Sequence, residues 1–125
     1  MRGYIYLISF ENTNDIYIGK TTQDIKNRFK DHKKDMFSTV YKYIKKNNIV
    51  NTYIDIIDSI DMNEDLSHLR DQYKYYTNLN NYKLSCLEMF HIHNYIREGK
   101  FNIINKKILG EKYVNIDYDN FFLKG

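Results

Sequence analysis

The sequence predicts a small α+β domain in which helices flank a three-stranded antiparallel sheet, in the element order β-β-α-α-β-α-α. Two runs of β-branched and aromatic residues, 3–10 and 15–20, are separated by a polar turn, as in a β-hairpin. Stretches with apolar residues at helical spacing follow the hairpin. With 125 residues the chain is long enough for one modest core, so we expect a single domain.

The hairpin places several aromatic side chains on one face of the predicted sheet. We expect Tyr6 to lie opposite Tyr17, which also places Tyr4 opposite Gly19 on the same face. Because glycine has no side chain, Gly19 would leave open space beside the two phenols.

A helix is expected after the hairpin, from about Gln23 to Lys34. Thr21 and Asp24 fit the Ser/Thr-x-x-acid pattern of a helix start. Arg28 lies at the edge of the inward stripe, so we expect it to point over the hairpin. The stripe itself consists of Ile25, Phe29, His32 and Met36.

Two tyrosines, the space left by a glycine, a lysine and an arginine are thus expected on one surface. This combination of phenols and positive charges suits an anionic ligand.

The remaining elements are predicted from the same kinds of pattern. They are a helix over 39–46, a strand over 50–60 beside the hairpin, a helix from 62 to about 76 capped by Asn63, a helix over 83–97 ended by Gly99, and an extended segment over 101–107. The last residues lack clear periodicity but are too apolar for a free tail. We therefore predict a domain over 1–110 and a C-terminal segment, 111–125, that docks on it.

Composition excludes several classes of protein. No apolar run approaches the roughly 18–20 residues that a bilayer span requires, and nothing at the start resembles a signal peptide. The single cysteine, Cys86, excludes an internal disulfide framework and suits a reducing compartment. With leucines at 84 and 87, Cys86 fits a buried hydrophobe better than a nucleophile. We expect an intracellular protein, cytoplasmic or nuclear, without a membrane partner.

The net charge of +3 is unevenly distributed along the chain. Residues 20–46 hold nine Lys or Arg against three acids, whereas residues 55–71 hold six acids against one arginine. A basic segment beside the hairpin would attract phosphate backbones without reading their sequence. The alternative is a solvated charged face with no ligand.

The order and spacing of the hairpin residues resemble the GIY-YIG nuclease superfamily. The first tripeptide is Tyr4-Ile5-Tyr6, with tyrosine where the family name has glycine, and the second, Tyr17-Ile18-Gly19, is a full match. The family arginine falls on Arg28 and the histidine that commonly follows it falls on His32. The resemblance covers roughly residues 3–107, and it implies the same α+β fold and a stand-alone catalytic domain.

The resemblance also implies a glutamate and an asparagine late in the chain. Glu88 has a glutamate-x-aromatic-x-aliphatic setting similar to that of the homing-endonuclease members. Burying a carboxylate costs several kcal/mol without a partner or a metal, so an ion pair with Arg28 or a lysine is the alternative role. Asp71 is a rival for the glutamate position. Asn105 resembles the closing asparagine of the family, with Asn102 as the second candidate.

These matches imply a metal-dependent endonuclease that hydrolyses DNA phosphodiester bonds. In this hypothesis Glu88 binds one Mg²⁺ or Mn²⁺, and Arg28 stabilises the charge of the transition state. Either Tyr6 or Tyr17 accepts a proton from the attacking water. A free phenol has a pKa of about 10, so this base needs a nearby cation.

Lys20 is expected to supply that cation. The Gly19-Lys20 pair resembles the excision-repair members, whereas other members carry the lysine where this chain has Ile16. His32 relays protons or binds a phosphate in this hypothesis, and a satisfied core histidine is the alternative.

The expected substrate is double-stranded DNA. Its backbone would be contacted by Lys20, Lys26, Arg28, Lys30 and Lys33. A homodimer, a targeting partner or the C-terminal segment would provide specificity, or cleavage is loosely specific. Two alternatives stay open: a catalytically inactive nucleic-acid-binding module of the same fold, and a protein-interaction domain that uses the 13 tyrosines of the chain.

Overall fold

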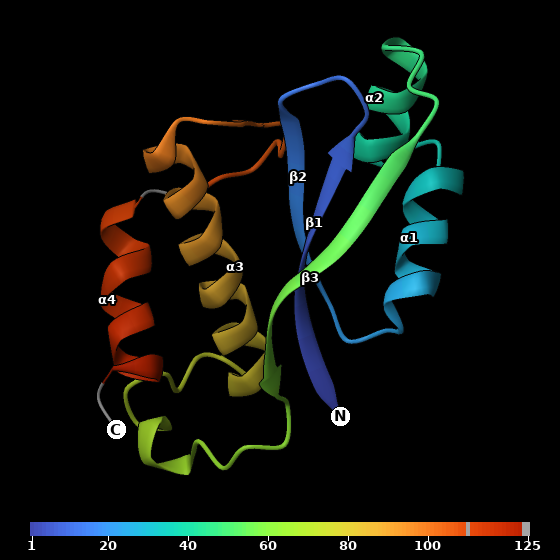
Figure 1. The fold of residues 1–125 in the computed structure, drawn as a ribbon. Helices are drawn as coiled ribbons and strands as arrows, with labels where there is room; N and C mark the ends of the chain where they lie inside the picture. The colour runs from blue at the N-terminus through green and yellow to red at the C-terminus, as the bar shows by residue number, and fades with distance from the viewer. Residues whose placement is uncertain (110, 124–125) are drawn as a thin grey trace.

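The computed structural model describes residues 1–109 and 111–123, with the side chains of 111–114 left out. Its described part contains a four-stranded sheet with helices on both faces (Figure 1). The strands are β1 (Arg2–Phe10), β2 (Asp15–Thr21), β3 (Thr52–Asp61) and β4 (Asn102–Ile103), in the spatial order β3-β1-β2-β4. The three antiparallel strands were predicted correctly, but the prediction of three strands in all was wrong. The short β4 adds a fourth strand, parallel to β2.

Helices cover the two faces of the sheet in pairs (Figure 1). α1 (Ile25–Lys34) and α2 (Thr39–Lys46) lie on one face, and α3 (Leu79–Glu98) lies on the other. α4 (Glu111–Phe122) packs on the outer side of α3, where the rings of Phe90 and Tyr118 stack with centroids 3.8 Å apart. The segment that lacks periodicity in sequence is therefore helical, because its aromatic residues pack against another helix.

The alternation of β1 divides the core into two layers. Ile5 faces α3 and joins a cluster with Leu84 and Leu87. Tyr6 and Ile8 face the other way and pack near α1 and α2. Because successive side chains of a strand point to opposite faces, a strand buried on both sides carries apolar residues at nearly every position. β1 has this pattern.

The predicted hairpin register was wrong by two residues. Tyr6 pairs with Gly19, and Tyr4 pairs with Thr21, whereas Tyr17 lies opposite Ile8. A shift of two residues keeps every side chain on its face, so the face of the phenols was predicted correctly. The shift nevertheless changes the neighbour of the glycine.

The predicted helix over 62–76 does not form, and only a 3-10 turn at Ser67–Leu69 is present. Asp61 and Asp65 each accept a hydrogen bond from the backbone N–H two residues later, a local turn that competes with helix formation. The helix predicted over 83–97 begins earlier, at Leu79. Asn78 caps α3 by accepting from the N–H of Asn81. Gly99 ends α3 with a positive φ of 71°, as expected.

Three further details differ from the predictions. Asp24 itself caps α1 by accepting from the N–H of Lys26, so the predicted Thr21 cap is not used. Met36 is exposed rather than inward, because α1 ends before it. The predicted extended segment over 101–107 pairs with β2 only at Asn102–Ile103.

Candidate active site

Tyr6 and Gly19 form the centre of the site, on the sheet face covered by α1. The Tyr6 side chain is fully buried. A Cβ atom built on Gly19 would lie 2.3 Å from Tyr6 Oη, so only glycine allows the phenol to lie across β2. Tyr17 is the next residue on this face of β2, and its ring centroid lies 6.5 Å from that of Tyr6.

A chain of hydrogen bonds connects the Tyr6 phenol to both helices of this face. Arg28 Nε donates to Tyr6 Oη at 3.2 Å, and Tyr6 Oη lies 2.6 Å from His32 Nε2. His32 Nδ1 lies 3.0 Å from Ser38 Oγ, which also caps α2. Burial and the nearby Arg28 lower the pKa of His32 to about 4, so the ring is neutral at pH 7. A neutral ring carries one N–H: in one tautomer Tyr6 donates to Nε2 and Nδ1–H donates to Ser38, and in the other Nε2–H donates to Tyr6 and Ser38 donates to Nδ1.

The environment keeps both phenols protonated at neutral pH. Burial raises the pKa of Tyr6, and the neighbouring Tyr17 adds to this effect. Burial and the charge of Glu88 raise the pKa of Tyr17, while Arg28 opposes both shifts. Arg28 is therefore the cation that favours the phenolate forms. Lys20, predicted to supply this cation, has its side chain on the opposite face of β2, near Glu88.

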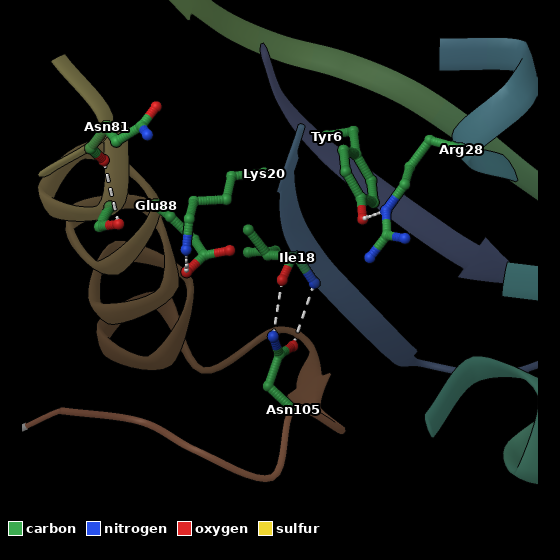
Figure 2. Close-up of polar contacts among 8 residues, drawn as sticks. Tyr6, Ile18, Lys20, Arg28, Asn81, Glu88 and Asn105 are labelled. Atoms are coloured by element: carbon green, nitrogen blue, oxygen red, sulfur yellow. Dashed lines mark hydrogen bonds and ion pairs between the residues drawn. The ribbon is translucent and has the colours of Figure 1, made fainter. Parts of the chain in front are cut away.

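Lys20 instead meets Glu88 of α3 on that opposite face (Figure 2). Lys20 Nζ lies 3.9 Å from Glu88 Oε1, too far for a hydrogen bond, and the Glu88 side chain is 12% exposed. Burial raises the pKa of Glu88, and Lys20 partly opposes this shift. Among the described residues, none donates a hydrogen bond to the Glu88 carboxylate. Because a buried charge without a close partner is costly, binding a cation would stabilise this carboxylate.

Asn105 holds the free edge of β2 between these two faces. Its Nδ2 donates to the carbonyl of Ile18 at 2.6 Å, and its Oδ1 accepts from the N–H of Ile18 at 3.0 Å (Figure 2). The amide thus takes the place of a paired strand just beyond the end of β4. Asn102 lies at the other end of β4, where its Nδ2 lies 3.2 Å from Asp15 Oδ1. The geometry favours Asn105 over Asn102 as the site residue.

The predicted site residues form two groups that lie on the two sides of β2. Figure 2 shows Tyr6 and Arg28 on one side of this strand and Lys20 and Glu88 on the other. The charge of Glu88 is among the causes that raise the pKa of both Tyr17 and Tyr6. Of the predicted site residues, hydrogen bonds join Tyr6 with Arg28 and His32, and the ring of Tyr17 lies against those of Tyr6 and His32. Lys20 and Glu88 form a separate pair, and Asn105 contacts Ile18 on the strand between the two groups.

A cavity of about 260 Å³ opens beside Arg28, between α1 and the start of α2. Its lining residues are Tyr17, Arg28, Asp31, His32, Asp35, Phe37, Ser38 and Thr39. Sequence reasoning assigned no role to Asp31 or Asp35. Their spacing from Arg28, three and seven residues, places them on the same side of a helix as Arg28, and this spacing could have predicted that they lie beside it.

Three of the lysines predicted to contact DNA lie apart from the site. Lys26, Lys30 and Lys33 are exposed, and their spacing places them on one side of α1, away from the side that carries Arg28. Lys33 lines a separate crevice with Lys45. Asp71, the rival of Glu88, is exposed in the turn region before α3 and does not line this cavity.

The residues present fit a metal held by one carboxylate. No group of three or more His, Cys, Asp or Glu side chains within the described ranges could hold an ion by itself. Mg²⁺, however, keeps several water ligands and is often bound through one or two carboxylates plus substrate phosphate. Glu88 can serve as such a carboxylate ligand, since its side chain is largely buried and its two oxygens accept no hydrogen bond from the described residues.

A β-hairpin with two tyrosines, an arginine on the next helix and a late glutamate define a nuclease-type domain. The family model of the GIY-YIG catalytic domain matches residues 2–63, which contain the hairpin, α1, α2 and β3. The chain belongs to the GIY-YIG superfamily.

One similar protein is protein 146R of Invertebrate iridescent virus 6, which is named for an MSV199 domain. It is 34% identical to this chain over an alignment of 76 residues, and the match covers 57% of this chain but only 31% of that protein. No solved structure matches the chain. Within the described ranges, every helix is too short or too polar to cross a membrane.

Proposed function

We propose that this protein is a divalent-metal-dependent endonuclease that hydrolyses phosphodiester bonds in double-stranded DNA. The observation that carries the proposal is that Arg28 with Tyr6, and Glu88 with Lys20, flank the same stretch of β2, whose backbone Asn105 holds at Ile18. Family membership supports a nuclease, and the contacts of each side chain support the roles that we assign below.

Glu88 would hold one Mg²⁺ or Mn²⁺. When bound, the ion would supply a Lewis acid that polarises the scissile phosphate. In its absence Lys20 partly balances the Glu88 charge. We infer that Lys20 keeps this carboxylate ionised and turned toward the edge of β2.

Arg28 is positioned to bind the phosphate. Its Nε donates to Tyr6, which orients the guanidinium plane, and no described residue accepts a hydrogen bond from its two terminal amino groups. A planar guanidinium with two free amino groups suits the oxygens of a phosphate. Arg28 would therefore stabilise the charge that develops on the phosphate during hydrolysis.

Tyr17 is the better candidate for the general base. Tyr6 is fully buried, and its oxygen already contacts Arg28 and His32. Tyr17 is only partly buried and lines the cavity. The charge of Glu88 is one cause of its raised pKa, so a cation at Glu88 would remove that cause while Arg28 still favours the phenolate. Tyr6 and His32 are positioning residues in this proposal.

The second candidate function is a nucleic-acid-binding module without catalysis. The Lys20 ammonium, 3.9 Å from Glu88, favours it because this ammonium would compete with a metal ion for the carboxylate. Such a module would bind DNA in a salt-sensitive manner and would not cut it.

A plasmid-nicking assay tests the proposal. Purified protein is incubated with supercoiled plasmid in Mg²⁺, Mn²⁺ or EDTA, and wild type is compared with Arg28→Ala and Glu88→Ala. We expect nicking with either metal, none in EDTA, and a loss of at least about a hundredfold in both variants. Asp71→Ala, an exposed acid outside the cavity, is the matched control and should nick like wild type.

The other outcomes separate the alternatives. Equal nicking by wild type and both variants would mean that the active site is elsewhere. Salt-sensitive binding without nicking in any metal would favour the non-catalytic module. Absence of both binding and nicking would favour a protein-interaction domain.

A further inference from the structure

The cavity beside Arg28 contains features that phosphate binding and hydrolysis do not use. Arg28 and Tyr17 line one side of it, which makes it continuous with the proposed site. Asp31, Asp35 and Phe37 line the remainder together with two hydroxyl groups. The chemistry of these three residues determines which part of a substrate could enter.

The two carboxylates disfavour a second phosphate in this cavity. His32 is neutral at pH 7, so Arg28 is the one positive charge among the lining residues, against Asp31 and Asp35. Asp35 Oδ1 accepts from the N–H of Phe37. No described group donates a hydrogen bond to the side chain of Asp31, so its carboxylate is available to accept from a ligand. A neutral ligand with N–H groups fits this environment better than an anion.

Phe37 adds a flat apolar surface at the mouth of the cavity. Its side chain is 80% exposed, which is unusual for a phenylalanine. Its turn is well fixed: the N–H of Ser38 donates to the carbonyl of Asp35 at 2.9 Å, and Ser38 Oγ contacts His32. The exposed ring is therefore presented on a rigid support that is connected to the site. Aromatic side chains held in this way are the usual stacking partners of unpaired bases.

The volume of the cavity limits the size of the ligand that it can hold. At about 260 Å³ it falls just below the roughly 300–1,000 Å³ of pockets for drug-sized ligands. It therefore suits one ring system better than a whole nucleotide.

We propose that this cavity binds one nucleobase that flanks the scissile phosphate and has left the base stack. The base stacks on Phe37, and Asp31 accepts a hydrogen bond from its exocyclic amino group. This inference rests on the proposed nuclease function, because Arg28 and Tyr17 would hold the adjoining phosphate. It identifies the substrate as DNA that is unstacked at the cut site, by the protein or beforehand.

The carboxylate predicts a base preference. Adenine, cytosine and guanine carry an amino group, whereas thymine presents a carbonyl and a methyl group at the corresponding positions. We expect cleavage to be at least about tenfold faster when the flanking base carries an amino group, consistent with one hydrogen bond to a charged acceptor. Asp31→Ala should remove this preference while cleavage continues.

The first test measures base unstacking without catalysis. Short duplexes with a single 2-aminopurine at successive positions are titrated with protein in EDTA, and the fluorescence rise of an unstacked base is recorded. We expect a rise at one position with wild type and its loss with Phe37→Ala. Met36→Ala is the matched control, because Met36 is also well exposed but does not line the cavity.

The second test uses substrates with an abasic site at that position. With an intact base, Phe37→Ala should lower kcat/KM by about tenfold, within the range of one stacked base. With the abasic substrate, wild type and Phe37→Ala should cleave equally. Phe37→Ala and Asp31→Ala both change exposed residues, so circular dichroism should show that these variants fold like wild type.

Several results would overturn the inference. Cleavage and fluorescence that do not change in Phe37→Ala and Asp31→Ala would show that the cavity does not bind a base. Self-association of wild type that is lost in Phe37→Ala, measured by sedimentation, would assign the ring to an interface between copies. A different result separates this inference from the proposed nuclease function. Unstacking in EDTA without cleavage in any metal would support the base-binding cavity and contradict the nuclease function.

Discussion

Removing the hydroxyl of Tyr6 tests the hydrogen-bond chain at the centre of the site. In Tyr6→Phe the ring keeps its packing against Gly19, but Arg28 Nε and His32 Nε2 both lose their partner. The deletion therefore isolates the polar contacts of a fully buried side chain from its apolar contacts.

The expected cost follows from what each partner can do afterwards. His32 is buried, so its Nε2 is left without a hydrogen-bond partner, which costs about 1–3 kcal/mol. Arg28 is only partly buried and can turn toward water, so it contributes less. We expect a loss of about 2 kcal/mol. For a chain of 125 residues this lowers Tm by about 8 °C.

The assay combines urea unfolding with plasmid nicking. We expect Tyr6→Phe to lose about 2 kcal/mol of unfolding free energy and about tenfold in nicking rate, because Arg28 is no longer oriented. Tyr75→Phe, which changes a largely exposed phenol, should stay within about 0.5 kcal/mol of wild type. If Tyr6→Phe were as stable and as active as Tyr75→Phe, the hydrogen-bond chain would have no role.

Three further predictions concern the strand edge and His32. Asn105→Ala removes both hydrogen bonds to Ile18, so urea unfolding should show a loss of about 2 kcal/mol and the nicking rate should fall. Gly19→Ala brings a methyl group 2.3 Å from Tyr6 Oη, and overpacking should cost about 1–3 kcal/mol in the same assay. His32 has a folded pKa of about 4 against an ordinary value of 6.5, so the unfolded chain binds more protons between these pH values. Its contribution to stability, about 3 kcal/mol, should be lost as the pH falls from 6.5 to 4.

Each of these predictions has a control. Asn102→Ala removes one exposed contact and should cost less than Asn105→Ala; the reverse order would assign the site to Asn102. If the clash with Tyr6 is the cause, Gly19→Ala and Tyr6→Ala should be non-additive in a double-mutant cycle. Urea unfolding of His32→Gln across the pH range should lack the part of the slope that His32 contributes. An identical slope in wild type would contradict the assignment of a neutral, buried His32.

The local elements near the start of the chain could be predicted because their signals are local. Alternation of apolar residues predicts the hairpin and the face that carries Tyr6 and Tyr17, and helical spacing predicts the helix that carries Arg28. The register could not be predicted, because a slip of two residues leaves the same pattern on the same face. The pairing of Tyr6 with Gly19 is decided by the ring that must fit over the glycine.

The late part of the chain was predicted less well, for one local reason and one long-range reason. Helical spacing over 62–76 was overridden by aspartate side chains that bind nearby backbone N–H groups. The two residues of β4 could not be predicted as a strand from the sequence, because only their parallel pairing with the distant β2 distinguishes them from a loop.

The sequence by itself determined the family resemblance, the two-layer alternation of the hairpin and the identities of the charged and phenolic groups, because these depend on residue type and short spacing. Only the tertiary structure decided which groups meet. It places Lys20 beside Glu88 rather than beside the phenols, and it connects Tyr6 through His32 to the helix that follows Phe37. The physical reason is that a strand separates neighbouring residues onto opposite faces, while packing brings distant segments together at its edge.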